Sequence, residues 1–380
     1  MSTFYNPVTV YSGNESVALF LTDLTKRLAP GADRILLLTR GGGVEGSPCL
    51  ASLYNWLQGY NVTSIEIQIA NPDVNDIWEL KNRLEGADYQ LVIAIGGGSV
   101  MDVAKVLSAF QGISLETKDA FREAIIDKTY RRQERYAPWI GIPTTSGTGS
   151  EVTSWATVWD EERGVKYSVD DPRLYASAAI ILPELAASMP LQLSVSTALD
   201  ALSHAVEAYW SVRTNPITRL YSLQAIERIM EALPQLKEDP ASEKLREQLA
   251  YASLYAGLAF SNTRTTACHS ISYPLTMLYG IEHGIATSIT IGSILSLNKE
   301  RLIDSHRLLK AFCADCVEDV QQIIFDIYRL YGIPTRLRDY GVTADSTTEI
   351  VKRAYTKGRM DNNPIEMTEQ DVHDVLQSLL

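Results

Sequence analysis

Short apolar runs and helix-like periodicities alternate along the first half of the chain. Continuous or alternating apolar residues predict β-strands at 34–39, 62–69, 91–95, 139–142, 165–169 and 179–182. Between these runs, apolar residues three and four positions apart predict helices at 48–60, 73–84 and 100–110. Strands that alternate with helices in this way are typical of a parallel, doubly wound sheet.

From about Pro190 onward the pattern is almost wholly helical. Apolar residues recur at spacings of three and four in the segments 194–210, 218–233 and 245–260. A chain of 380 residues is long enough for two domains with separate cores. We therefore predict an α/β domain over residues 1–186 and an all-helical domain over residues 187–380.

The net charge and the hydropathy of the chain restrict which partners it can bind and in which cellular compartment we expect it. The formal net charge of −12, without any basic stretch, argues against binding to nucleic acid. The N-terminal segment lacks the basic flank and apolar core of a signal peptide, and no segment has the roughly 18 consecutive apolar residues that cross a bilayer. We expect a cytoplasmic protein that acts on small molecules and binds no membrane.

The four cysteines are too few and too scattered for a disulfide framework. Cys313 and Cys316 match the CxxC pattern of redox and zinc sites. However, they lie in a run with helical periodicity, residues 308–324, with no second pair and no preceding strand. We interpret them as two ordinary helix thiols.

The candidate metal chemistry lies in the helical half. Asp200 and His204 are four residues apart, so they share one helix face and can offer two ligands to one ion. His269 and His283 follow in another apolar segment, and any one of these residues alone could be an ordinary core or surface side chain. Together, one carboxylate and three imidazoles suit Fe, Zn, Mn or Ni, whereas Ca and Mg prefer oxygen ligands.

Two polar loops that follow predicted strands are candidate cofactor sites. In GGGSVMDVAK, residues 96–105, three glycines join a strand to a helix, where backbone N–H groups and the helix dipole favour a diphosphate. The turn lacks the GxGxxG spacing of the usual dinucleotide fold. Ser99 could instead cap the helix, and Asp102 and Lys105 could be solvated. The second loop, PTTSGTGSEVT at 143–153, could bind a nicotinamide ribose or a diphosphate, or be a plain connection.

These stretches together resemble the iron-containing (group III) alcohol dehydrogenase family. The matching pieces are GGGSVMDVAK, PTTSGTGSEVT, DALSHAVEAY, the segment from His269 to His283, and DNNP at 361–364, in the family's order. The resemblance implies a nucleotide-binding α/β domain followed by a helical metal-binding domain, an architecture shared with dehydroquinate synthase. It also implies a homodimer and Fe(II) as the metal, with Zn, Mn or Ni as alternatives.

The resemblance also assigns roles to single residues. It implies a metal held by Asp200, His204, His269 and His283. It implies contacts with the dinucleotide from Gly97, Gly98, Ser99, Asp102, Thr144, Thr145 and Thr148, with Lys166 near the cofactor. The reaction that it implies is hydride transfer between a nicotinamide and a carbonyl group polarised by the metal.

Arg40 departs from the family pattern, in which many members have an aspartate at the end of the second strand that favours NAD. In this chain Thr39-Arg40-Gly41 occupies that place. A guanidinium attracts a 2′-phosphate, so we predict NADP(H) in preference to NAD(H), unless Arg40 is a solvated loop residue.

Two further departures concern the substrate. Tyr273 stands where the family usually has a histidine, and it could relay a proton or only pack, because the reference pKa of tyrosine is about 10. Arg264 stands five residues before His269, where family members commonly carry a small residue. A cation so near a metal needs an anionic partner, either a nearby carboxylate or an acidic group on the substrate. The run 262–276 resembles the phosphonoacetaldehyde reductase (hydroxyethylphosphonate dehydrogenase) branch of the family.

We therefore expect the chain to reduce phosphonoacetaldehyde to 2-hydroxyethylphosphonate. Within the dehydrogenases, a small neutral alcohol or lactaldehyde is the runner-up substrate. Two other classes stay open: a lyase related to dehydroquinate synthase, and a non-catalytic metal- or nucleotide-binding protein. The Asp/His/His/His pattern favours the dehydrogenase over the lyase, and turnover of any aldehyde separates an enzyme from a binding protein.

Overall fold

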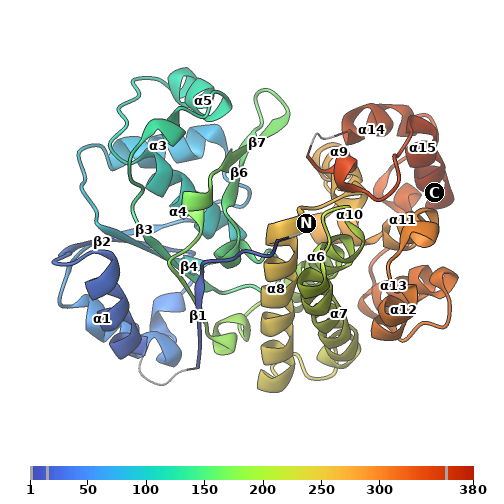
Figure 1. The fold of residues 1–380 in the computed structure, drawn as a ribbon, viewed down its shortest axis with the longest axis horizontal. Helices are drawn as coiled ribbons and strands as arrows, with labels where there is room; N and C mark the ends of the chain where they lie inside the picture. Colours follow the sequence, from blue (N-terminus) through green and yellow to red (C-terminus); the bar gives the residue numbers. More distant parts are fainter. Residues whose placement is uncertain (1–2, 14–16, 356–357) are drawn as a thin grey trace. The chain divides into compact units, whose positions relative to one another are not determined.

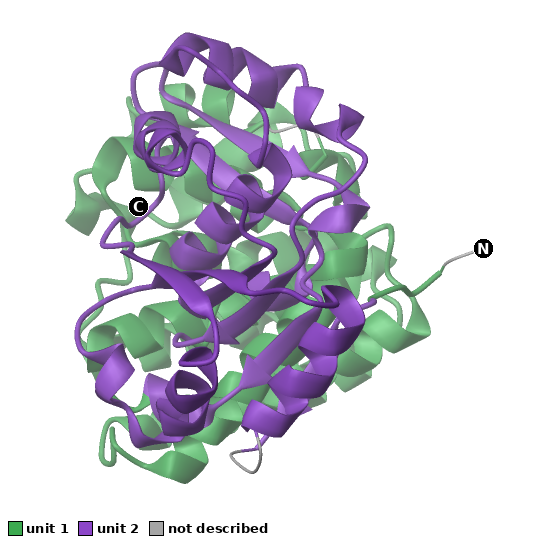
Figure 2. Cartoon of the chain, turned by 90° about the vertical axis from the view of Figure 1, so that its left-hand side faces the viewer, with its two compact units in different colours: residues 1–6, 146–149, 187–380 green, residues 7–145, 150–186 purple. Residues whose placement is uncertain are grey.

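A computed structural model gives the fold and describes residues 3–13, 17–355 and 358–380 (Figure 1). The chain divides into two compact units (Figure 2). The α/β unit consists of residues 7–145 and 150–186, and the helical unit consists of residues 1–6, 146–149 and 187–380. The short segment 146–149 therefore belongs to the helical unit, although both of its neighbours in the chain belong to the α/β unit.

A six-stranded sheet lies at the centre of the α/β unit. All its paired strands run parallel, in the order β1-β8-β5-β4-β2-β3. The strands are β1 (Thr9–Ser12), β2 (Arg34–Thr39), β3 (Asn61–Glu66), β4 (Leu91–Gly96), β5 (Trp139–Pro143) and β8 (Ala178–Ile181). The predicted parallel sheet is confirmed, although the strand predicted to run to residue 69 ends at Glu66, and β1 was not predicted.

Helices cover both faces of this sheet. On β2, Ile35 and Leu37 share a core with α1 (Val17–Leu28) and α2 (Ala51–Leu57). Leu36 and Leu38 share the opposite core with α3 (Val74–Arg83), α4 (Gly98–Phe110) and α5 (Lys118–Ile126). Because successive side chains point to opposite faces and both faces are covered, the central strands are apolar at nearly every position.

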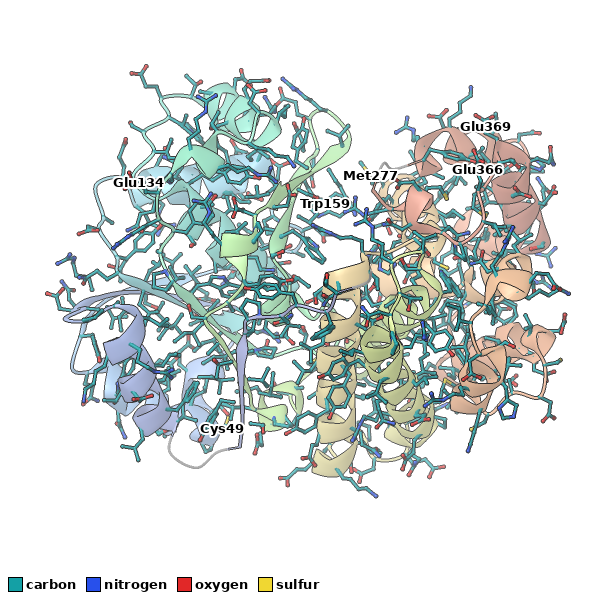
Figure 3. The ribbon with its side chains drawn as sticks, in the orientation of Figure 1. Cys49, Glu134, Trp159, Met277, Glu366 and Glu369 are labelled. Atoms are coloured by element: carbon teal, nitrogen blue, oxygen red, sulfur yellow. The ribbon has the colours of Figure 1, made fainter. Side chains whose placement is uncertain are left out.

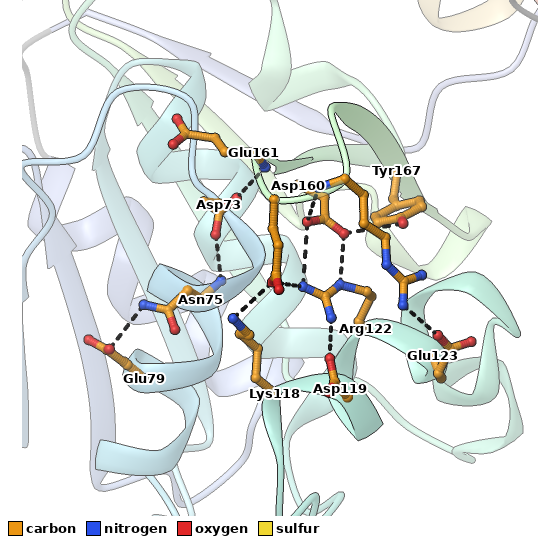
Figure 4. A network of polar contacts seen from close by, with 12 residues as sticks. Asp73, Asn75, Glu79, Lys118, Asp119, Arg122, Glu123, Asp160, Glu161 and Tyr167 are labelled. Carbon is orange, nitrogen blue, oxygen red and sulfur yellow. Dashed lines mark hydrogen bonds and ion pairs between the residues drawn. The ribbon is translucent and has the colours of Figure 1, made fainter.

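A separate antiparallel hairpin completes the α/β unit. It pairs β6 (Trp155–Asp160) with β7 (Val165–Asp170), so the strand predicted at 165–169 lies outside the parallel sheet. Arg122 on α5 anchors this hairpin: its buried guanidinium pairs with Asp160 at the end of β6, Nε to Oδ2 2.7 Å, and with Glu162, Nη2 to Oε2 2.6 Å (Figure 4). A buried guanidinium needs such partners, so the network holds the hairpin against the helix.

The helical unit confirms the periodicity seen after Pro190. Its helices are α6 (Leu191–Trp210), α7 (Pro216–Leu236), α8 (Glu243–Thr263), α9 (Ala267–Tyr279), α10 (His283–Ser288), α11 (Ile291–Asn298), α12 (Ser305–Phe312), α13 (Val317–Tyr331), α14 (Thr347–Ala354) and α15 (Glu369–Ser378). Apolar residues of these helices form one continuous buried cluster. Among the residues that the structure describes, no helix is long and apolar enough to cross a membrane.

The interpretation of Cys313 and Cys316 as helix thiols was wrong. α12 ends at Phe312, Cys313 adopts a left-handed conformation with φ 57°, and Cys316 is the N-cap of α13. Both thiols are exposed. Apolar periodicity continues across this turn because both flanking helices are amphipathic, so the pattern concealed the break between them.

Candidate metal and cofactor sites

Three of the four predicted metal ligands converge within the helical unit. Asp200 lies on α6, His269 lies on α9, and His283 begins α10. One potential ligand atom of each lies within 4.8 Å of the other two. The Nε2 atoms of His269 and His283 lie 3.5 Å and 3.8 Å from Asp200 Oδ1. This mixture of nitrogen and oxygen ligands suits a borderline divalent ion.

His204 lies beside this group, one turn after Asp200 on α6. Its Nδ1 is 3.8 Å from Asp200 Oδ2, and its ring stacks on Phe260 and on His269 at centroid distances of 4.0 Å and 4.4 Å. Burial lowers the pKa of His204 to about 4, so its imidazole is neutral, the form that binds a metal. Its role as the fourth ligand stays a prediction.

Buried polar atoms of these residues lack hydrogen bonds. Asp200 Oδ1, His204 Nδ1 and His269 Nε2 have no hydrogen-bond partner in the described part of the chain. Buried side-chain polar atoms are hydrogen-bonded in the large majority of cases, so three exceptions in one place need an explanation. Binding to a metal ion would satisfy Asp200 Oδ1 and His269 Nε2, which belong to the converging group, and the residues present therefore fit a metal site.

Glu207 is a site residue that the sequence reasoning missed. It is fully buried on α6, its Oε2 contacts His269 Nδ1, and its Oε1 accepts hydrogen bonds from Thr266 Oγ1 (2.9 Å) and from the N–H of His269 (3.2 Å). A carboxylate on the outer ring nitrogen fixes the tautomer that leaves Nε2 for a metal. Burial alone would lower the pKa of His269, but the carboxylates of Glu207 and Asp200 outweigh it and raise this pKa to about 9. Glu207 could have been identified from its spacing, because it lies seven residues, or two helical turns, after Asp200 and so shares its helix face.

Gly284 allows His283 to reach the group. An ideal Cβ at this position would lie 1.8 Å from the carbonyl oxygen of Ser196 and 3.0 Å from the backbone nitrogen of Asp200. Only glycine therefore permits α10 to lie this close to α6. Because His283 is the first residue of α10, this close approach brings its ring to Asp200.

Tyr273 and Arg264, the two predicted substrate residues, flank His269 in the chain. Tyr273 lies one turn after His269 on α9, its ring is parallel to that of His283 at a centroid distance of 6.0 Å, and burial raises its pKa. Arg264 is the C-cap of α8, so it lies in the connection before α9 and not on the helix of His269. It is half-buried, and its φ of 61° and ψ of 178° lie in a region that non-glycine residues rarely occupy.

The glycine-rich turn after β4 has the geometry of a phosphate site. Gly97 is the N-cap of α4, whose first turn has no side-chain cap and no acidic residue. A Cβ at Gly96 would lie 2.3 Å from Val100 Cγ2, and a Cβ at Gly97 would lie 3.0 Å from Thr145 Oγ1. The turn thus has no room for a side chain at Gly96 and little room at Gly97, and the first N–H groups of α4, from Gly98 onward, are left uncapped by side chains for an anion.

The polar residues of α4 do not lie as expected. Ser99 does not cap the helix, because its Oγ accepts a hydrogen bond from the N–H of Asn71 (3.2 Å). Lys105 is completely buried, and its Nζ donates to Ser150 Oγ (2.7 Å), Thr153 Oγ1 (3.0 Å) and the carbonyl of Trp155 (2.8 Å).

Asp102 accepts hydrogen bonds from Ser150 Oγ (2.9 Å) and from the N–H of Thr157 (3.0 Å). The alternative that Asp102 and Lys105 are solvated is therefore wrong. The β6–β7 hairpin packs on α4 and shares its core, and it removes Lys105 from water, whereas 17% of the Asp102 side chain stays exposed. Their hydrogen bonds connect α4 to the loop that follows β5.

The remaining predicted cofactor residues lie in three places. Thr144 is buried with its N–H bonded to the Gly96 carbonyl (3.0 Å), and Thr145 contacts Gly97, so both border the glycine-rich turn. Thr148 lies on the segment that belongs to the helical unit. Lys166 on β7 holds its Nζ 3.6 Å from the ring centroid of Trp159, its cross-strand partner on β6. Trp159 is labelled in Figure 3.

Arg40 directly follows β2, and its N–H donates to the carbonyl of Ile95 on β4 (3.0 Å). The carboxylate of Glu66, the last residue of β3, lies against Gly41, since a Cβ there would be 1.6 Å from Glu66 Oε1. The carboxyl ends of β4, β2 and β3 therefore carry the glycine-rich turn, a guanidinium and a carboxylate side by side. In open α/β sheets this is the edge at which nucleotides bind.

Comparison with known proteins matches two family models to most of the chain. The model of iron-containing alcohol dehydrogenases matches residues 7–183, and that of the C-terminal region of the Fe-containing alcohol dehydrogenase family matches residues 194–380. A phosphonoacetaldehyde reductase of Streptomyces viridochromogenes is 32% identical, over 72% of this chain and 68% of its own. An NADPH-dependent butanol dehydrogenase of Clostridium saccharobutylicum is 27% identical, over 90% of this chain and 91% of its own.

A solved structure gives the same fold. The crystal structure of sulfoacetaldehyde reductase from Bifidobacterium kashiwanohense in complex with NAD+ has a TM-score of 0.85 and 27% sequence identity. The similarity covers 100% of this chain and 98% of that one, so it includes both units.

Proposed function

The chain belongs to the iron-containing alcohol dehydrogenase family, and we propose that it reduces phosphonoacetaldehyde, a small aldehyde with an acidic head group, to 2-hydroxyethylphosphonate. As a member of this family it is an oxidoreductase that acts on alcohols and aldehydes. The main support for a metal-dependent reaction is the cluster of Asp200, His269 and His283. Within the described residues, Asp200 Oδ1 and His269 Nε2 of this cluster are buried and have no hydrogen-bond partner. In this proposal the α/β unit binds the dinucleotide, and the helical unit binds the metal and the substrate.

Asp200, His204, His269 and His283 would hold the metal, for which we propose Fe(II), with Zn, Mn or Ni as alternatives. When bound, the ion supplies Lewis acidity for the carbonyl oxygen, and the dinucleotide supplies the hydride. Glu207 holds the outer nitrogen of His269, which keeps the inner nitrogen turned towards Asp200. The uncapped first turn of α4, beside Thr144 and Thr145, would bind the diphosphate.

Arg264 is our candidate for recognition of the acidic head group. A backbone conformation such as that of Arg264 costs about 1–3 kcal/mol and persists mainly at functional sites. The strained residue lies in the short connection that leads into α9, the helix of His269. Two of the relatives are named for aldehydes that carry an acidic group, a phosphonate in one and a sulfonate in the other. A guanidinium fork that binds such a group would fix the carbonyl at reacting distance.

For the dinucleotide we propose NADP(H) over NAD(H). Arg40 ends the strand next to β4, whereas Glu66 ends β3, one strand farther from the glycine-rich turn. Arg40 is therefore one strand nearer to the turn than Glu66, and its guanidinium would attract a 2′-phosphate. Arg40→Ala should lower kcat/KM for NADPH at least 10-fold and leave that for NADH unchanged; an equal loss for both would refute the assignment.

A second candidate substrate is a small neutral alcohol, because one relative is a butanol dehydrogenase. The two proposals separate in one experiment with the metal-reconstituted protein. We would compare kcat/KM for phosphonoacetaldehyde and butyraldehyde in the wild type and in Arg264→Ala. A loss confined to the phosphonate supports the proposal, and an equal loss with both aldehydes would show that Arg264 does not orient the substrate.

We also propose that the protein is a cytoplasmic homodimer, as the family resemblance implies. Sedimentation equilibrium of the purified chain distinguishes a dimer from a monomer of 42.1 kDa.

A further inference from the structure

A second arginine lies near the candidate metal ligands. The guanidinium carbon of Arg359 is 5.1 Å from the centroid of the Tyr273 ring. That ring is parallel to the ring of His283, with an angle of 2° and a centroid distance of 6.0 Å. His283 Nε2 lies 3.8 Å from Asp200 Oδ1. Stacked groups therefore connect Arg359 to the metal site through two contacts.

Arg359 has no carboxylate partner within 4.0 Å among residues 3–13, 17–355 and 358–380. Two other arginines of the helical unit, by contrast, do have one: Arg329 pairs with Asp326, and Arg353 pairs with Glu349. Arg359 is also half-buried, which reduces its solvation. A partly desolvated cation without a counterion favours an anion from solution, even in a chain with 46 acidic and 34 basic residues.

The loop of Arg359 is fastened to the loop of Arg264. The buried side chain of Asn362 donates from Nδ2 to the carbonyl of Gly358 (2.7 Å) and to the carbonyl of Thr265 (3.1 Å). Each arginine is the chain neighbour of one of these two carbonyls. A single amide thus fixes the backbone of both arginine-bearing segments at the same place.

We propose that Arg359 binds the acidic head group of the substrate and that Tyr273 holds the guanidinium in position by a cation–π contact. This inference rests on the proposed reductase function and deepens it. Together with Arg264, Arg359 supplies a second positive charge, which favours a doubly charged phosphonate over a singly charged sulfonate. Tyr273 is then a positioning residue for Arg359 and not the proton donor.

The test uses Arg359→Met, which keeps much of the side-chain length without the charge, and Arg359→Lys, which keeps the charge without the planar fork. We expect Arg359→Met to lower kcat/KM for phosphonoacetaldehyde about 10- to 100-fold, as loss of a charge-assisted hydrogen bond does. The loss should be smaller for sulfoacetaldehyde and less than about twofold for butyraldehyde, which offers no anion to Arg359. Arg359→Lys should retain part of the preference.

Arg228→Met is the matched control. Arg228 is also half-buried in the helical unit, and its guanidinium carbon lies 5.6 Å from the centroid of the Tyr255 ring. Arg228→Met should leave unchanged the ratios among the kcat/KM values for phosphonoacetaldehyde, sulfoacetaldehyde and butyraldehyde. Calorimetric titration with ethylphosphonate, an unreactive anion, gives a second measurement, in which Arg359→Met should weaken binding by a similar factor.

The outcomes distinguish the two proposals. If the wild type prefers phosphonoacetaldehyde but Arg359→Met keeps that preference, the role of Arg359 is wrong and the proposed function stands. If Arg359→Met lowers all three rates equally, the residue is only structural. If the wild type prefers butyraldehyde and does not bind ethylphosphonate, both the anionic substrate and the role of Arg359 are overturned.

Discussion

Replacement of Glu207 by glutamine tests how the metal site is held in place. The carboxylate of Glu207 accepts at both oxygens, from His269 Nδ1 and N–H and from Thr266 Oγ1. A glutamine has nearly the same shape but one oxygen and one NH2 group. If the NH2 group faces Nδ1, His269 must carry its proton on Nε2, the nitrogen that a metal requires. If the amide is reversed, its NH2 group opposes the backbone N–H of His269.

Either orientation of the amide costs at least one good hydrogen bond next to a metal ligand. Loss of an outer carboxylate partner of this kind weakens metal binding about 10- to 100-fold. At about 1.4 kcal/mol per factor of ten, this corresponds to about 1.4–2.8 kcal/mol. We expect Glu207→Gln to bind Zn²⁺ or Fe²⁺ more weakly by that factor, with the loss of activity recovered in part at high metal concentration.

Competition with a chromogenic chelator measures this affinity directly. Glu151→Gln is the control, because Glu151 is also a buried glutamate but belongs to the α/β unit. It should keep the metal affinity of the wild type. A folded Glu207→Gln protein with wild-type affinity, or an equal loss in Glu151→Gln, would refute the reasoning that Glu207 fixes the tautomer of His269.

Three further predictions follow from single positions. Gly284→Ala places a methyl group 1.8 Å from the Ser196 carbonyl oxygen, so metal affinity should fall at least 10-fold and Tm should drop. The control Gly46→Ala, whose methyl group would meet no atom within 4 Å, should change neither the metal affinity nor Tm. Arg264→Gly should be more stable to denaturant than Arg264→Ala by about 1 kcal/mol, because only glycine adopts its φ of 61° and ψ of 178° without strain; equal stability would contradict this. Burial raises the pKa of Glu151 from 4.5 to about 7, so the free energy of unfolding should decline by about 3 kcal/mol as the pH rises from 4.5 to 7. Glu151→Gln should remove this decline, which thermal unfolding of both proteins at pH 5 and pH 8 would reveal.

The central strands and the long helices could be predicted because their apolar patterns are set by burial. The run at 34–39 is apolar because helices cover both faces of the sheet. The segment 194–210 is rich in apolar and small residues because α6 is buried on all sides, at every position from Ala198 to Trp210. The β6–β7 hairpin was not predicted, because only its second strand, 165–169, was identified and the alternating segment that forms β6 was not interpreted as a strand. This omission also explains the error over Lys105, whose burial depends on that hairpin.

Some residues of the candidate site could likewise be predicted from the sequence, and others could not. Asp200 and His204 could be found because their spacing places them on one helix face, and the structure brings His269 and His283 to the same place. Glu207 was accessible by the same spacing argument, but a lone acidic residue on a helix is usually solvated. The role proposed for Arg359 could not be predicted from the sequence, because Arg359 lies in an irregular loop. The proposal depends on its contact with the ring of Tyr273, which is 86 positions away in the chain.

The central claim is a metal-dependent, nicotinamide-linked reduction of an aldehyde. The most direct test is the oxidation of NADPH and NADH by the Fe(II)-reconstituted protein with phosphonoacetaldehyde, sulfoacetaldehyde and butyraldehyde, beside an Asp200→Ala variant. We predict turnover that requires the metal, with phosphonoacetaldehyde preferred, and no metal and no turnover in the variant. Equal rates in the variant and the wild type, or no turnover of any aldehyde by the metal-loaded wild type, would contradict the account.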